Sequence, residues 1–129
     1  GKELKTIQGN SAVFRPVAFS PNGKIIAAGG DKNTIKLIDV TTGKELKTFI
    51  GHSNFIYSIQ FSPDGKNIVS GSADQSIKLW DPLTGKEIRT FSGQSSVIYS
   101  TAFSPDGKTI AAGNDNYTIK LWDAKNGKD

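Results

Sequence analysis

Residues 51–81 read GHSNFIYSIQFSPDGKNIVSGSADQSIKLWD, and this stretch decides the fold. From Phe55 to Ser62, large apolar side chains alternate with smaller or polar ones, which is the period-two pattern of a half-buried strand. Residues 62–65, which overlap the end of this stretch at Ser62, suit a tight turn, because Pro fits its second position and Gly accepts a positive φ. Three more short strands are predicted at 68–70, 76–80 and 87–91. No helical periodicity of useful length is present, so we predict an all-β chain.

The same pattern occurs three times, in copies spanning 1–42, 43–84 and 85–126. Seventeen of the 42 columns are identical in all three copies. A fixed period of this size is typical of arrays whose units stack to bury their apolar faces. The pattern runs past both ends and the chain contains no methionine. We therefore expect a piece excised or engineered from a longer array.

The composition excludes several classes of protein. With 36% hydrophobic and 22% charged residues, the chain is expected to fold as a globular protein. No apolar stretch approaches the roughly 18 residues that span a bilayer, so we expect no membrane partner. The absence of cysteine excludes disulfides, thiolate zinc sites and cysteine nucleophiles. We expect a cytoplasmic location, with no location assignable if the chain is engineered.

Several motifs recur in register with the repeat. Trp80-Asp81 and Trp122-Asp123 each end a third strand, and Gly51-His52 lies about thirty residues before the first of them. The Phe-Ser-Pro-Asp/Asn-Gly-Lys segment begins at Phe19, Phe61 and Phe103. Together these motifs resemble the WD-repeat β-propeller family over the whole chain. The resemblance implies a partial β-propeller across residues 1–129, built from three four-stranded antiparallel blades.

In that family, each sequence repeat begins with the outer strand of the preceding blade. Residues 1–9 would then be an outer strand without a blade, while the last blade would lack one. Because three blades are too few to close a ring, we expect a homo-oligomer in which Leu4 and Thr6 of one chain pair beside Ile119 and Leu121 of the next. A six-blade dimer and a nine-blade trimer are both considered. The trimer is favoured, since contracting a seven-blade geometry overlaps the inner strands, whereas widening it loses contacts gradually.

The resemblance also implies a buried hydrogen-bonded tetrad, for which only the second copy has the residues: His52, Ser70, Asp74 and Trp80, with Ser72 as the other candidate serine. His52 is the only histidine. A catalytic or metal-binding role for it would need a second placed titratable group or further ligands. We therefore prefer the structural role and predict no catalytic residues, no metal and no cofactor.

Positions that differ between the copies are candidates for binding a partner at the channel rim, where the first strand of each blade begins. These candidates are Arg15, Phe55, Tyr57 and Tyr99, with Asp31 and Asp115 nearby. Arg and Tyr are frequent in interface hot spots. The alternative, weighted equally, is that the aromatic rings pack between blades.

The net charge of +4 raises the question of nucleic-acid binding. However, 12 of the 16 basic residues fall at four repeated columns, which spreads the charge around the ring. Lysines on exposed outer strands protect against edge-to-edge aggregation. We therefore expect no nucleic-acid partner.

These observations favour a non-catalytic scaffold for protein–protein interaction that assembles as a multichain ring. Its expected partners are further copies of itself, with a peptide or protein ligand at the channel rim as a further candidate. The first alternative is an engineered or excised fragment with only a structural self-assembly role. The second is an enzyme, for which the sequence offers no catalytic constellation.

Overall fold

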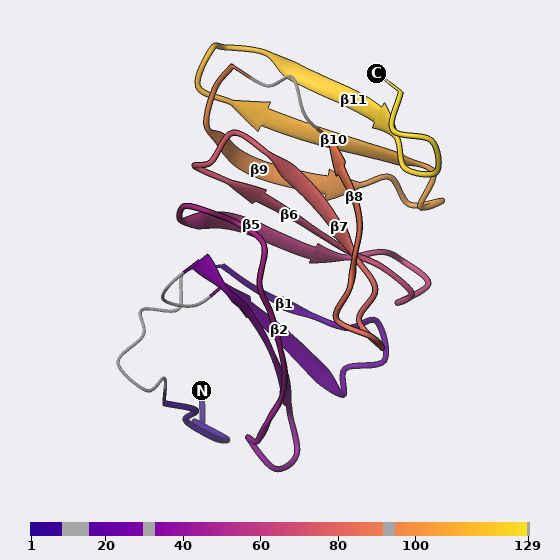
Figure 1. Ribbon diagram of the computed structural model, residues 1–129. Coiled ribbons are helices and arrows are strands. Elements are labelled where there is room, and N and C mark those ends of the chain that lie inside the picture. The colour runs from indigo at the N-terminus through magenta and orange to yellow at the C-terminus, as the bar shows by residue number, and fades with distance from the viewer. Residues whose placement is uncertain (9–15, 30–32, 92–94, 129) are drawn as a thin grey trace.

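The computed structural model describes residues 1–8, 16–29, 33–91 and 95–128. Within them, eleven strands form three antiparallel sheets, and there is no α-helix (Figure 1). The first sheet has four strands in chain order: β1 (Val17–Phe19), β2 (Ile25–Gly29), β3 (Ile35–Asp39) and β4 (Glu45–Phe49). The described part of the chain has no helix that could span a lipid bilayer.

The second sheet repeats this order with β5 (Ile56–Phe61), β6 (Ile68–Ser72), β7 (Ile77–Trp80) and β8 (Glu87–Phe91). The third sheet has only three strands: β9 (Ile98–Phe103), β10 (Thr109–Asn114) and β11 (Ile119–Asp123). The sheets follow one another as layers, with the two chain termini at opposite ends of the stack (Figure 1). The prediction of an all-β chain with three antiparallel blades is confirmed. In the single chain, residues 1–8 are in no sheet, and residue 9 lies outside the described part.

The recurring Ser-Pro-Asp/Asn-Gly-Lys segment builds the turn between the first two strands of each blade. In the second blade, Ser62 Oγ donates to Asp64 Oδ1 at 2.6 Å, and the backbone N–H of Lys66 donates to the same oxygen at 3.0 Å. The hydrogen bond from Ser62 lowers the pKa of Asp64, so its carboxylate stays ionised in the turn. Gly65 has φ of 74°, a conformation that favours glycine. The repetition of these residues therefore reflects turn geometry.

The apolar core lies between neighbouring blades. Ile35 and Leu37 of β3 are buried with Ile59 and Phe61 of β5, in one continuous cluster. A second cluster joins the second and third blades through the equivalent columns. Trp80 stacks on Phe49 of the preceding blade, with ring centroids 5.6 Å apart. Each blade therefore depends on its neighbours for burial of its faces.

At the N-terminal end of the stack, the first blade leaves one apolar face in solvent. Val17 and Phe19 of β1 are 65% and 63% exposed. The residues in the same columns of the second blade, Ile59 and Phe61, are each 7% exposed, because the first blade covers them. The single chain therefore ends in a face that has the residues of an interface between blades.

Candidate functional site

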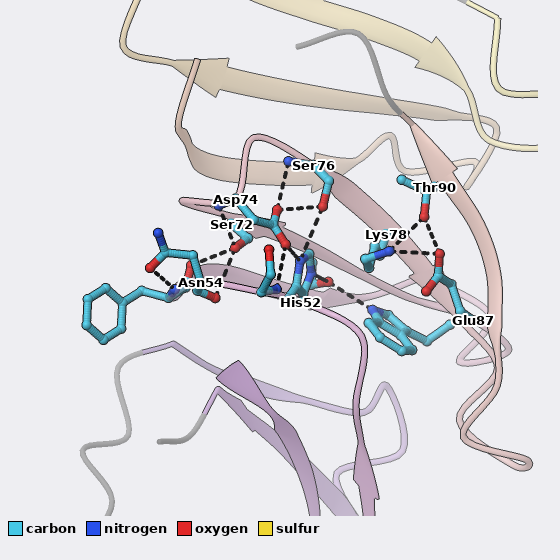
Figure 2. Close-up of polar contacts among 12 residues, drawn as sticks. His52, Asn54, Ser72, Asp74, Ser76, Lys78, Glu87 and Thr90 are labelled. Atoms are coloured by element: carbon cyan, nitrogen blue, oxygen red, sulfur yellow. Dashed lines mark hydrogen bonds and ion pairs between the residues drawn. The ribbon is translucent and has the colours of Figure 1, made fainter. Parts of the chain in front are cut away.

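The four side chains predicted for the tetrad lie together in the second blade (Figure 2). His52 comes from the loop before β5, and its Nδ1 lies 2.8 Å from Asp74 Oδ2 in the β6–β7 turn. Its Nε2 lies 2.6 Å from Ser70 Oγ on β6. Trp80 on β7 donates from Nε1 to the same hydroxyl at 2.8 Å. The network therefore joins a loop, two strands and a turn of one blade.

Ser72, the other candidate serine, makes hydrogen bonds to backbone groups instead of to His52 or Trp80. Its hydroxyl donates to the backbone carbonyl of Phe55 at 2.8 Å and accepts from the backbone N–H of Asp74 at 3.0 Å. It thus ties the loop before β5 to the β6–β7 turn. The serine between histidine and tryptophan is Ser70, which is fully buried.

The electrostatics of the network favour a neutral histidine beside an ionised aspartate. Burial lowers the pKa of His52, although its hydrogen bond to Asp74 acts in the opposite direction. Burial also opposes ionisation of Asp74, but hydrogen bonds from Ser76, His52 and the backbone N–H of Ser53 lower its pKa to about 2. His52 Nδ1 therefore carries the proton and donates it to Asp74, while Nε2 accepts from Ser70.

Both ring nitrogens of His52 are thus engaged within the blade. A general base or metal ligand would need a nitrogen directed toward a substrate or ion. Among the described residues, no group of three or more His, Asp or Glu side chains is placed to hold a metal. The arrangement is that of a structural hydrogen-bond network.

The rim candidates can be placed in part. Tyr57 of β5 and Tyr99 of β9 face each other across the boundary between the second and third blades, with ring centroids 5.3 Å apart. Tyr99 is 52% exposed, and Tyr57 is half-buried. The pair therefore packs between blades and also presents aromatic surface to solvent. Arg15 and Asp31 lie outside the described residues.

Two further candidates are exposed at the same edge of the sheets. Phe55 immediately precedes β5, and Asp115 lies in the β10–β11 turn. The same turn holds Tyr117, which sequence analysis missed. Its side chain is wholly exposed and its φ is 65°, which is unfavourable for an aromatic residue. Its column holds Asn and Gln in the other copies, and this difference was the signal available in the sequence.

The outer edge of β11 is the third candidate surface. Ile119 and Leu121 are 78% and 57% exposed, whereas Ile35 and Leu37 in the same columns of β3 are buried. The difference arises because the second blade covers Ile35 and Leu37, while the described part of the chain has no blade after the third. The third blade therefore exposes an apolar face that the next blade covers in the other two, and its last strand, β11, is unpaired on its outer side among the described residues.

Residues 1–8 lie beside the first blade (Figure 1). The ammonium of Lys5 donates to the backbone carbonyl of Thr41, in the turn between β3 and β4. Arg89, in the same column of β8, donates to the carbonyl of Lys125 at 2.9 Å, in the turn that follows β11. The N-terminal segment thus makes the contact that an outer strand makes with the following blade.

Leu4 and Thr6, predicted to pair with the end of another chain, do not contact Ile119 or Leu121 within the single chain. Leu4 is exposed, and Thr6 donates a hydrogen bond to Glu3. The two candidate pairing segments therefore lie at opposite ends of the stack.

Two protein-family models match the sequence. The model described as "WD domain, G-beta repeat" matches residues 43–81 and 85–123, which is more than half of the chain. The model of the anaphase-promoting complex subunit 4 WD40 domain matches residues 3–61. Comparison with individual curated proteins gave no match. With three blades of the expected strand order and two matched repeats, the chain belongs to the WD-repeat family.

Proposed function

We propose that this chain is a protein-interaction scaffold that closes into a ring with further copies of itself. WD repeats imply a propeller scaffold that binds protein partners, and families of this kind are generally non-catalytic. The ring would form when residues 3–8 of one chain pair with the open edge of β11 in the next. The observation that carries the proposal is the exposure of Ile119 and Leu121 on β11, whose counterparts in the other blades are buried.

The two ends of the stack support this assembly because their exposed faces have matching residues. Within the chain, columns equivalent to Val17 and Phe19 pack against columns equivalent to Ile119 and Leu121. Joining the two ends would thus repeat an interface that the chain already contains. Burying this apolar surface is favourable at about 25 cal/mol per Å².

Such a head-to-tail contact forms a ring when the rotation between chains closes. We propose a trimer with nine blades in preference to a dimer with six. In a six-blade ring the inner strands would be forced together, whereas a nine-blade ring loses inner contacts gradually.

Substitution on β11 tests the assembly. Leu121→Lys places a charge in the proposed junction, while the exposed position keeps the single chain folded. We expect wild type to give the mass of three chains in native mass spectrometry and L121K to give that of one. The matched control Leu83→Lys alters an exposed leucine outside the junction and keeps the trimer. An L121K protein with the wild-type mass would contradict the proposed junction.

We further propose that a peptide or protein partner binds at the rim formed by Phe55, Tyr57, Tyr99 and Asp115. Arg15 and Asp31 belong to this proposal by their columns. Exposed tyrosines are well suited to interfaces because they combine large contact area with a polar group. Assembly into a ring would repeat this surface around the axis, which favours multivalent binding.

Selection of a displayed peptide library on the assembled ring tests the rim. We expect enriched peptides to lose at least about tenfold in affinity for Tyr99→Ala, since truncating a hot-spot residue costs about 2 kcal/mol or more and about 1.4 kcal/mol is tenfold. Leu83→Ala, on an exposed residue outside the proposed rim, serves as the matched control. Enriched peptides that bind Y99A and wild type equally would contradict the rim site.

A further inference from the structure

A lysine, a glutamate and a threonine form a polar cluster on the last two strands of the second blade (Figure 2). Lys78 Nζ of β7 lies 2.9 Å from Glu87 Oε1 of β8 and donates to Thr90 Oγ1 at 2.8 Å. Thr90 in turn donates to Glu87. The side chains of Lys78 and Glu87 are 11% and 33% exposed, so the pair is partly screened from solvent.

The first blade repeats this cluster in the same columns. Lys36 Nζ of β3 lies 3.0 Å from Glu45 Oε2 of β4, and Thr48 Oγ1 donates to Glu45 Oε1 at 2.6 Å. Hydrogen bonds from Thr48 and Lys36 lower the pKa of Glu45, which keeps its carboxylate charged. In both blades the lysine lies directly opposite the threonine in the strand register.

In the third blade the members of this cluster are separated between the two ends of the chain. Lys120 of β11 has no hydrogen-bond or ion-pair partner among the described residues of its own chain. At the other end, Thr6 donates to Glu3, as Thr48 does to Glu45. The N-terminal segment thus carries the acidic half of the cluster without its lysine.

We infer that Lys120 of one chain pairs with Glu3 and Thr6 of the next and sets the register of strand exchange. This inference rests on the proposed ring and identifies the partner of the β11 edge as a second copy of this chain. Lys120 lies opposite Thr6, as Lys36 lies opposite Thr48 in β3 and β4.

The charge pattern of the segment explains why this pairing specifies a register. A slip by one residue would place Lys120 opposite Ile7 in one direction and opposite Lys5 in the other, where like charges directly opposite each other are destabilising. The same slip would turn the apolar side chains to the other face of the sheet. Electrostatic and apolar terms therefore select one alignment.

Charge reversal tests the pair. We expect Glu3→Lys and Lys120→Glu each to raise the dissociation constant of a junction by roughly tenfold, since each replaces an attraction by a repulsion. The concentration at which half of the chains are assembled rises accordingly. The double variant E3K/K120E restores opposite charges at every junction and assembles at nearly the wild-type concentration. The effect of each single variant shrinks in high salt. Lys125→Glu is the matched control, because it makes the same change of charge outside the proposed pairing register.

A mixture of the two single variants also reports the number of chains in the ring. Opposite charges then meet wherever E3K and K120E chains alternate, which is possible around a ring with an even number of chains. A trimer must contain one junction between like chains, so the mixture stays weaker than the double variant. Full recovery as mixed dimers would support the pair and replace the nine-blade ring by a six-blade ring.

The outcomes separate this inference from the ring itself. Wild type that remains a single chain in native mass spectrometry at all concentrations would overturn the proposed ring. Wild type that assembles, with E3K and K120E assembling equally well, would retain the ring and overturn the pair. Failure of the double variant to recover, with both single variants weakened, would also overturn the pair.

Discussion

At the scale of the residue, the hydroxyl of Ser70 joins two buried polar groups, His52 Nε2 and Trp80 Nε1, which have no other hydrogen-bond partner among the described residues. It accepts from Trp80 Nε1 and donates to His52 Nε2. Ser70→Ala would leave both groups buried without a hydrogen bond, at a cost of about 1–3 kcal/mol each when unpaired. We therefore expect the free energy of unfolding of S70A, measured with urea, to fall by about 2 kcal/mol or more. The control S53A, at an exposed serine, should change stability by less than about 0.5 kcal/mol. An S70A variant as stable as S53A would contradict this role.

The His52–Asp74 pair makes the stability of the chain depend on pH. The folded-state pKa of Asp74 is about 2, against 3.8 for an unperturbed aspartate, so the unfolded state binds more protons between these values. Its contribution is present above pH 3.8 and is lost as the pH falls through about 2. The pKa of His52 is also lowered, so acidification below its ordinary value of 6.5 acts in the same direction.

We expect the stability difference between wild type and Asp74→Asn to narrow as the pH falls from about 4 to 2. Other carboxylates contribute to both proteins and cancel in this difference. Urea midpoints measured at each pH provide the comparison. A difference that stays constant across this interval would show that Asp74 is not held ionised by the network.

At the scale of the element, a glycine that recurs in all three copies, as Gly29, Gly71 and Gly113, lies where neighbouring blades can approach closely. A Cβ at Gly71 would lie 2.5 Å from Ile98 Cγ2, so the second and third blades meet too closely for a side chain there. At Gly113, in the same column of the third blade, the nearest atom to such a Cβ is Ser100 Oγ at 3.8 Å. The two positions differ because the structure contains a following blade in one case and none in the other.

These glycines give a paired prediction. Gly71→Ala should lower the free energy of unfolding of the chain by about 1–3 kcal/mol, the usual cost of overpacking.

Gly113→Ala should leave the stability of the single chain unchanged and weaken assembly, because the first blade of the next chain would approach that face in the proposed ring. Unfolding measured at low concentration and mass measured at high concentration separate the two effects. A G113A protein that assembles like wild type would contradict close approach at this face.

The strands themselves could be predicted because each has a strong local signal. The alternation around Ile59 and the Ser-Pro-Asp-Gly turn after it depend on neighbouring residues alone. Residues 1–6 are identical in sequence to residues 43–48, which contain most of β4, yet residues 1–8 form no strand in the single chain. A strand needs a paired edge, and local sequence does not say whether that edge lies in the same chain.

The candidate site was predicted less completely. His52, Asp74 and Trp80 could be placed through a motif, but the choice between Ser70 and Ser72 depends on which hydroxyl points into the blade. Tyr117 was not singled out because its full exposure and positive φ are properties of the folded chain, which a sequence column does not reveal. Contacts across blades are set by packing and are the hardest to read from sequence.

At the scale of the whole molecule, the described residues form two sheets of four strands and one of three, and the proposed ring would complete the third sheet with a strand from another chain. This chain lacks a strand in its last sheet, its first residues resemble that strand, and its two end faces match its internal interfaces. In the single chain, the two end faces leave apolar side chains in solvent. Together these features favour assembly with further copies of the same chain.

The most direct test of this account is the mass of the wild-type chain in solution, measured by native mass spectrometry over a range of concentrations. One chain has a mass of 13.8 kDa. The account predicts a closed complex with three times this mass, with no larger open polymers. A single species at 13.8 kDa at every concentration would contradict it.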